Sequence, residues 1–161
     1  MEFRAITDDG QLEEAAGVIR DSFATVAGEL NLTRENCPTH PSFTGRKELT
    51  EMKKKGVGLF GLYLEDRLAG FVALEKVDEK LYYLEKLAVL PEERHKGYGE
   101  NLLGFACLRA AALGARVVSA GIINEQEILK SWYESLGFTE KETRSYPILP
   151  FTVCFMEMEL S

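Results

Sequence analysis

Apolar residues recur at helical spacing early in the chain, which predicts two helices before residue 56. The first should run from a cap at Asp8 or Asp9 to about residue 30, because its apolar side chains share one helix face: Leu12, Ala15, Ala16, Ile19, Phe23 and Val26. After a loop over residues 31–43, Thr44 is expected to cap a second helix. That helix should end at the run Lys53-Lys54-Lys55-Gly56, since cations and glycine suit a helix C-terminus.

Strand patterns dominate the next part of the chain. A short first strand is expected at residues 3–6, and three longer ones at residues 58–64, 69–76 and 81–89. Short polar turns separate the three longer strands, which predicts antiparallel pairing among them.

The second half of the chain alternates helix and strand patterns. Residues 100–113 are apolar on nearly every side, which predicts a buried helix, and residues 116–123 form a strand pattern rich in Val and Ile. A strand, a helix and a strand in this order predict a parallel pair with a right-handed crossover. Asn124 followed by Glu127 matches a capping box, so a helix is expected from there to about residue 136.

Two strand patterns, at residues 138–146 and 151–160, complete the chain. The last one alternates apolar and acidic residues, which predicts one solvent-facing side. Together the elements predict the α/β class and a single domain over residues 1–161. Its sheet should be mixed, mostly antiparallel and twisted, with about six or seven strands and about four helices shared between both faces.

Charge and composition limit the partners. The net charge is −7, and 45% apolar with 28% charged residues is ordinary for a globular protein. A chain of this charge repels nucleic acid and anionic membranes, so neither is an expected partner and any anion site must be local. No apolar run approaches the roughly 20 residues of a membrane span.

The cysteines and histidines predict a reducing compartment and no transition-metal site. Cys37, Cys107 and Cys154 are odd in number and lack C-x-x-C spacing, so free thiols in a reducing, cytoplasmic compartment are expected. With only His40 and His95 besides, the sequence predicts no transition-metal site.

The segment from Arg94 to Gly99 is the strongest candidate for chemistry. It lies between a strand pattern and a helix pattern, where the first helical N–H groups have no internal partner and carry partial positive charge. Gly97 and Gly99 allow close approach of an anion to the backbone, and Arg94 and Lys96 add charge. These features predict a phosphate or pyrophosphate site.

Two common phosphate motifs are excluded by particular residues. No Gly-Lys-Ser or Gly-Lys-Thr occurs, which excludes a Walker loop. Gly97 and Gly99 match the start of a dinucleotide fingerprint, but its third position is Leu102, too large for close packing of helix on strand. Asn124, rather than an acidic residue, follows the next strand.

A third pattern matches. Arg94-x-x-Gly97-x-Gly99 resembles the [RQ]-x-x-G-x-[GA] pyrophosphate loop of the GNAT superfamily of acyl-CoA N-acyltransferases. Residues 84–91 are similar to the family's fourth strand, whose end splays from the next strand. Asn124 and residues 132–138 are similar to its "N, then YExLGF" segment, and the order of elements agrees. The resemblance implies a GNAT-like fold.

The resemblance also implies acetyl-CoA (coenzyme A) as co-substrate and assigns residues to it. The pyrophosphate would meet the loop Arg94, His95, Lys96, Gly97, Tyr98 and Gly99. Lys96 as a plain surface cation stays an open alternative. The pantetheine arm would pair with the backbone at Leu87, Ala88 and Val89, where the Val89 N–H polarises the thioester carbonyl. Asn124 would contact the arm in addition to capping its helix.

Three residues are candidates for proton transfer. Tyr133 matches the family tyrosine near the CoA sulfur and would protonate the leaving thiolate; a plain core aromatic is the alternative. By strand parity, Glu85 should share an apolar face with Tyr83, Leu87 and Val89, where it is a candidate base acting directly or through water, or a structural group. His40 is a base or a substrate contact near the acceptor, or else a surface residue.

The function implied is transfer of an acetyl group from acetyl-CoA to a primary amine of a small molecule, by direct attack in a ternary complex. A protein or peptide N-acetyltransferase and a non-catalytic acyl-CoA-binding module stay open, as does a homodimer. The resemblance places the acceptor at residues 22–45 and 142–153, and the charge of −7 favours a cationic amine such as a polyamine or amino sugar.

Overall fold

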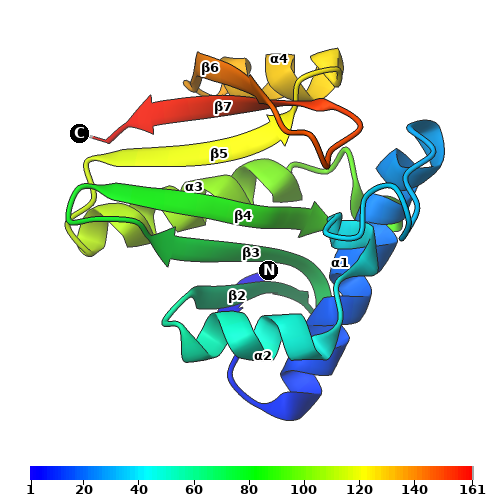
Figure 1. Ribbon diagram of the computed structural model, residues 1–161. Coiled ribbons are helices and arrows are strands. Elements are labelled where there is room, and N and C mark those ends of the chain that lie inside the picture. The colour runs from blue at the N-terminus through cyan, green and yellow to red at the C-terminus, as the bar shows by residue number, and fades with distance from the viewer. Residues whose placement is uncertain (161) are drawn as a thin grey trace.

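Seven strands form one twisted sheet in the computed structural model, which describes residues 1–160 (Figure 1). The spatial order is β1-β2-β3-β4-β5-β7-β6, and every neighbouring pair is antiparallel except β4 with β5. This confirms the predicted mixed, mostly antiparallel sheet. The strands are β1 (Glu2–Ala5), β2 (Gly58–Leu64), β3 (Arg67–Lys76), β4 (Leu81–Val89), β5 (Val117–Ile123), β6 (Thr139–Ser145) and β7 (Thr152–Glu159).

Helices cover both faces of the sheet and enclose two cores. On one face, α1 and α2 bury Ile19 and Leu49 against β2 and β3, and on the other, α3 and α4 bury Leu102 and Tyr133 against β3, β4 and β5 (Figure 1). Burial of apolar area on both sides holds the sheet in place. The helices are α1 (Asp9–Glu29), α2 (Arg46–Lys54), α3 (Tyr98–Ala112) and α4 (Glu127–Ser135).

One predicted helix cap is confirmed and two are wrong. Asp8 caps α1, accepting from the Gln11 N–H at 2.8 Å while the Gln11 side chain accepts from the Asp8 N–H at 3.1 Å. Thr44 does not cap α2: it ends a short 3-10 helix (Pro41–Phe43), and Gly45 is the N-cap. Thr44 is buried there, and its hydroxyl has no partner within residues 1–160.

Asn124 does not cap α4 either. Its N–H donates to the Thr152 carbonyl at 2.8 Å, so the chain is still tied to β7 at that point and cannot yet turn into a helix. The helix begins three residues later at Glu127, with Gln126 as its N-cap.

A β-bulge in β4 overturns the predicted face of Glu85. Ala73 pairs with Glu85 and Phe71 with Ala88, so two residues of β4 oppose Val72, and Lys86 takes a positive φ of 53°. An extra residue reverses the alternation of side chains beyond it. Glu85 therefore lies on the face of α1 and α2, whereas Leu87 and Val89 pack against the core beneath α3 and α4.

The two parallel strands separate beyond the bulge. Pairing of β4 with β5 runs from Leu81 with Val117 to Leu84 with Ala120 and goes no further in the described residues, although both strands continue. Figure 1 shows β4 and β5 diverging toward their C-terminal ends. This opening between residues 85–89 and 121–123, which we call the splay, agrees with the predicted one.

Candidate active site

Backbone groups of β4 line the splay. The Leu90 N–H donates to the Ala69 carbonyl of β3 at 2.9 Å, and backbone groups along a strand point alternately to its two sides. The N–H and C=O of Val89, and those of Leu87 two residues earlier, therefore point away from β3 into the splay. Ala88 points its backbone groups toward β3, so of the three predicted arm-binding residues only Leu87 and Val89 offer theirs to an extended ligand.

The loop before α3 has the geometry of an anion site. Gly97 is the N-cap of α3 in a left-handed conformation (φ 86°), and His95 before it also has a positive φ of 63°. The first bond of the helix runs from the Asn101 N–H to the Gly97 carbonyl at 3.1 Å. The N–H groups of Tyr98, Gly99 and Glu100 precede it and have no acceptor within the helix, which suits a pyrophosphate.

Gly99 joins this loop to the splay and to α4. A Cβ built at Gly99 would lie 3.4 Å from Trp132 Cζ2 and 3.9 Å from Val89 Cγ2. The start of α3, the end of β4 and the residue before Tyr133 are thus in contact distance of one another. The predicted loop and arm residues therefore meet the residue next to Tyr133.

The cations of the loop face the protein. The Arg94 guanidinium donates to the Ser22 carbonyl of α1 and, at 3.4 Å, to Thr25 Oγ1. Lys96 Nζ lies 3.1 Å from a Glu93 carboxylate oxygen, and Glu93 also pairs with Arg67 at 2.8 Å. The side chain of Arg94 therefore secures the loop to α1, whereas the half-exposed Lys96 side chain and the backbone N–H groups that begin α3 can still meet an anion.

Tyr133 is 4% exposed in the core between α3, α4 and the sheet. Its ring packs edge-to-face on Trp132 and Phe138, with centroids 5.0 and 5.2 Å apart. Burial raises the pKa of Tyr133 above its ordinary value, so the hydroxyl stays protonated at neutral pH. A buried, neutral hydroxyl is a proton donor and not a base.

Glu85 lies on the opposite face of the sheet from Tyr133. Burial, followed by the charge of Glu75 on β3, raises the pKa of Glu85 to about 7. The next residue, Lys86, pairs with Glu48 of α2 at 3.1 Å and leaves Glu85 without a salt bridge in the described residues. A carboxylate that is half-ionised at neutral pH is suited to accept a proton there.

The Asn124 side chain pairs with a lysine side chain of α4 instead of capping the backbone of that helix. Its side-chain oxygen accepts from Lys130 Nζ at 2.5 Å, and Lys130 Nζ also lies 3.7 Å from Glu140. The amide therefore links the end of β5 to α4 and β6. Its contact with the cofactor arm stays a prediction.

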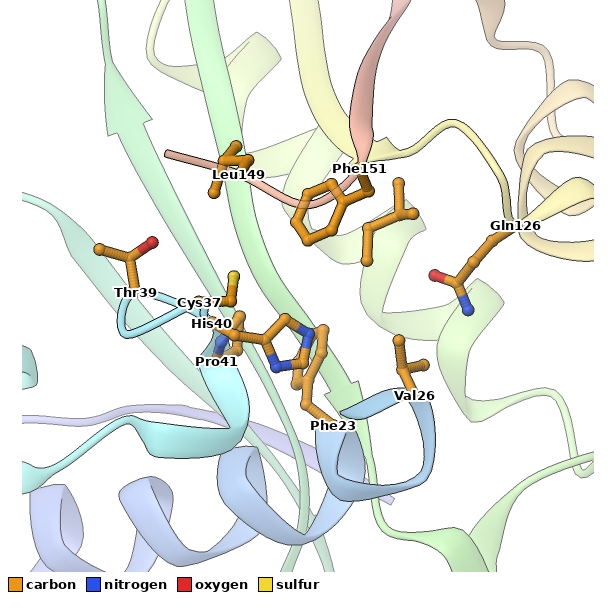
Figure 2. A pocket seen from close by; sticks show the side chains of 10 residues that line it. Phe23, Val26, Cys37, Thr39, His40, Pro41, Gln126, Leu149 and Phe151 are labelled. Carbon is orange, nitrogen blue, oxygen red and sulfur yellow. The ribbon is translucent and has the colours of Figure 1, made fainter. Parts of the chain in front are cut away.

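A cavity of about 180 Å³ lies between the end of α1, the loop after it and the β6–β7 connection (Figure 2). The lining comes from both predicted acceptor segments, from the end of β5 and from the N-cap of α4: Phe23, Val26, Cys37, Thr39, His40, Pro41, Ile123, Gln126, Leu149 and Phe151. Sequence patterns did not single out these apolar residues, because each looks like an ordinary core or loop residue. The Pro-rich loop around His40 was the one local signal.

His40 lines the cavity and is only 6% exposed, so the predicted alternative of a surface residue is wrong. The Ser42 N–H donates to His40 Nδ1 at 3.3 Å, so Nδ1 is the acceptor nitrogen and Nε2 carries the proton. Burial, with a smaller effect of Lys86, lowers the pKa of His40 to about 4. The ring is uncharged at neutral pH.

Residues 1–160 contain neither a cluster suited to a metal ion nor a helix suited to spanning a membrane. No group of three or more His, Cys, Asp or Glu side chains is placed to hold a metal ion. No helix in the same range has the length and apolar character needed to cross a lipid bilayer.

The geometry defines an α/β fold that can hold a pyrophosphate at α3 and an extended arm between β4 and β5. The family model described as "Acetyltransferase (GNAT) family" matches residues 28–138, and the chain belongs to this family. It is an acyl-CoA-dependent N-acetyltransferase by class, with acetyl-CoA as co-substrate, and this confirms the fold and enzyme class predicted from the motifs.

Solved structures agree on the fold. The chain is similar to PaiA N-acetyltransferase from Thermoplasma acidophilum in complex with coenzyme A, with a TM-score of 0.81 at 18% identity, over 99% of this chain and 100% of that one. The ribosomal-protein-S18-alanine N-acetyltransferase from Escherichia coli gives 0.77 at 17%, over 99% and 94%. An aminoglycoside 6'-N-acetyltransferase complexed with coenzyme A gives 0.72 at 13%, over 99% and 97%. No curated protein matches the chain.

Proposed function

We propose that the chain transfers an acetyl group from acetyl-CoA to the primary amine of a small molecule, by direct attack in a ternary complex. The preference for a small-molecule acceptor rests on a cluster of apolar residues at the proposed acceptor site. Leu32, Cys37 and Ile123 are buried together, and Leu149 and Phe151 pack on them. The β6–β7 connection is thereby joined to the loop after α1, so the cavity is walled on two sides, whereas a peptide needs an open groove.

The fold alone does not choose the acceptor. Among similar structures, one is named for a ribosomal-protein alanine and another for an aminoglycoside. The closure by Leu149 and Phe151 is therefore the reason to prefer a small molecule. A protein or peptide acceptor is the alternative that an experiment must exclude.

Cofactor binding in this proposal uses the backbone. The pyrophosphate accepts from the N–H groups that begin α3, and the arm enters the splay beside Leu87 and Val89. Two similar structures are complexes with coenzyme A, which supports coenzyme A as the ligand of this fold. Trp132 and Gly99 would border the arm where it passes from the loop to the splay.

The proposed mechanism uses a base and an acid that lie on opposite faces of the sheet. Glu85 takes a proton from the acceptor ammonium, and the neutral nitrogen attacks the thioester carbon to form the C–N bond. The Val89 N–H stabilises the oxyanion, a contribution that can reach about 3 kcal/mol. As the C–S bond breaks, Tyr133 gives its proton to the sulfur. The nitrogen, which is positively charged after attack, loses a second proton to solvent, and solvent reprotonates Tyr133. Glu85 also releases the proton that it took, so ammonium and thioester become amide, thiol and one free proton.

None of the three thiols is activated to carry the acetyl group, although Cys37 lines the cavity. Cys37, Cys107 and Cys154 are buried and free, and burial raises the pKa of each one. Direct attack is therefore preferred over a relay. Three free buried thiols also support a reducing, cytoplasmic location, which fractionation of the source cells would test.

An acceptor screen that measures thiol release from acetyl-CoA tests the proposal, with the product identified by mass. Small primary amines should release coenzyme A, and a panel of peptides with free α-amines or lysines should not compete with them. Turnover of peptides alone would establish the protein-modifying alternative. Acetyl-CoA binding without thiol release from any amine would point to a non-catalytic module.

A further inference from the structure

We propose that the cavity bordered by Phe23, Leu149 and Phe151 binds an uncharged, apolar substituent of the acceptor. The preferred substrates are then monoamines that carry a compact phenyl or branched alkyl group, and polyamines and amino sugars are poor ones. This inference rests on the proposed function and specifies its substrate class. It departs from the expectation of a polycationic acceptor, which came from the net charge of the whole chain.

The lining of the cavity is apolar on both sides. Phe23 and Val26 come from α1, and Leu149 and Phe151 face them from the β6–β7 connection (Figure 2). Burying an apolar substituent between these side chains is favourable in proportion to the area removed from water. Ring edges of Phe23 and Phe151 also suit an aromatic substituent.

No formal charge lines the cavity. Its polar side chains are those of Thr39, His40 and Gln126, and His40 is neutral because its Nδ1 accepts from Ser42 and its ring is buried. A second ammonium group would enter this cavity without a carboxylate to pair with it, which is strongly unfavourable. Glu75 and Glu85, on β3 and β4, do not line the cavity.

The size of the cavity suits one compact group. A dry apolar cavity of about 150 Å³ can accommodate a benzene molecule. The cavity here has about 180 Å³ and opens to solvent, and this volume is enough for a phenyl or branched alkyl group. The amide of Gln126 points into the space and can pair with a single polar atom on the substituent (Figure 2).

The cavity is placed beside the reacting centre. Ile123, the last residue of β5 and thus part of the splay, lines it. On the other side, the charge of Lys86, next to Glu85, acts on His40. A substituent held in the cavity would leave the amine on the side of Ile123, at the end of the splay.

A series of amines tests the inference on the wild-type chain. The ratio kcat/KM is measured by thiol release for 2-phenylethylamine, 3-methylbutylamine, 1,3-diaminopropane, spermidine and glucosamine. We expect 2-phenylethylamine and 3-methylbutylamine to exceed the other three by at least about tenfold. A ranking with spermidine or glucosamine first would overturn the inference and leave the acetyltransferase function intact.

A charge placed in the cavity provides the second test. Leu149→Asp should lower kcat/KM for 2-phenylethylamine at least about tenfold and raise it for 1,3-diaminopropane, because the new carboxylate pairs with a second ammonium. Ile148→Asp is the matched control: Ile148 is adjacent, 76% exposed and outside the lining, and should leave the ranking unchanged. Thermal unfolding of both variants checks that they fold.

The KM for acetyl-CoA distinguishes the remaining outcomes. If Leu149→Asp raises that KM and leaves the ranking of amines unchanged, the cavity belongs to the cofactor arm and the inference is wrong. If the wild-type chain releases no thiol with any of the five amines but acetylates peptides, the proposed small-molecule function fails, and the inference fails with it.

Discussion

The hydroxyl of Tyr83 on β4 rests against the backbone of Gly121 on β5. A Cβ built at Gly121 would come closer than 3.0 Å to that oxygen, a distance that real Cβ atoms essentially never show. Tyr83 is one residue before Leu84, the last residue of β4 to pair with β5. The Tyr83 side chain therefore reaches across the point where the strands part, and the lack of a side chain at Gly121 makes room for it.

Gly121→Ala should disturb this junction. The added methyl group displaces the Tyr83 hydroxyl, and we expect a loss of about 1–3 kcal/mol in the free energy of unfolding together with lower kcat. Adding Tyr83→Phe removes the oxygen that clashes and should recover most of the loss. Denaturant unfolding and thiol release measure both effects. If the double variant is as unstable as Gly121→Ala, the hydroxyl is not the cause.

Tyr133→Phe tests the proposed acid. The ring keeps its packing on Trp132 and Phe138, so the fold should be retained, while kcat falls at least about tenfold with little change in affinity for coenzyme A. Kinetics and titration with coenzyme A measure the two quantities. Tyr82→Phe, at another buried tyrosine of the same core, is the control and should keep full turnover. Normal turnover in Tyr133→Phe would remove its role.

Glu85→Gln tests the proposed base through pH. Because the pKa of Glu85 is raised to about 7, wild-type kcat/KM should fall about tenfold for each unit below that pH as the carboxylate is protonated. The variant should lose on the order of a hundredfold in rate and lose this acid limb. An unchanged pH–rate profile in Glu85→Gln would assign the base elsewhere.

Glu75→Gln is the matched control for this assignment. The charge of Glu75 is one of the causes that raise the pKa of Glu85, so its removal should move the acid limb to lower pH without abolishing it.

The raised pKa of Glu85 also predicts how the stability of the protein depends on pH. A carboxyl whose pKa is raised by folding destabilises the native state as pH rises through about 7, so Glu85→Gln should be more stable than wild type at pH 8.

Gly97→Ala tests the phosphate loop. Gly97 has a φ of 86°, where alanine costs about 1 kcal/mol or more, and the strain should move the N–H groups that begin α3. We expect a higher KM for acetyl-CoA and little change in the KM for the amine. Gly104→Ala is the control: nothing lies within 4 Å of a Cβ at this position inside α3, so alanine should stabilise by about 0.5–1 kcal/mol and leave kinetics unchanged.

Arg94 and Lys96 should differ on truncation. Arg94→Ala removes the bonds to Ser22 and Thr25, and we expect a loss of about 1–2 kcal/mol in stability along with weaker acetyl-CoA binding, because the loop is released from α1. Lys96→Ala breaks an exposed pair with Glu93 and should change stability by less than about 0.5 kcal/mol. Thermal unfolding and KM for acetyl-CoA measure both variants. Equal effects of the two would contradict the structural role of Arg94.

Local patterns were enough for most of the fold. The strands Gly58–Leu64 and Leu81–Val89 have the predicted bounds, and the cap of α1 at Asp8 was read from its own neighbours. The capping box at Asn124 failed for a non-local reason: pairing with Thr152, 28 residues further along the chain, keeps that residue extended. Hydrogen bonds between distant segments compete with local signals and leave no trace in them.

The sequence by itself determined the class of the protein, because a glycine-containing turn between a strand and a helix, with the segment from Trp132 to Phe138, is a local pattern. Only the tertiary structure decided the face of Glu85, which depends on one extra residue in β4 against Val72. It also decided the partners of Arg94 and the apolar cavity, whose walls come from residues 23–41 and 149–151. Packing between segments so far apart depends on the whole fold, and no local periodicity encodes it.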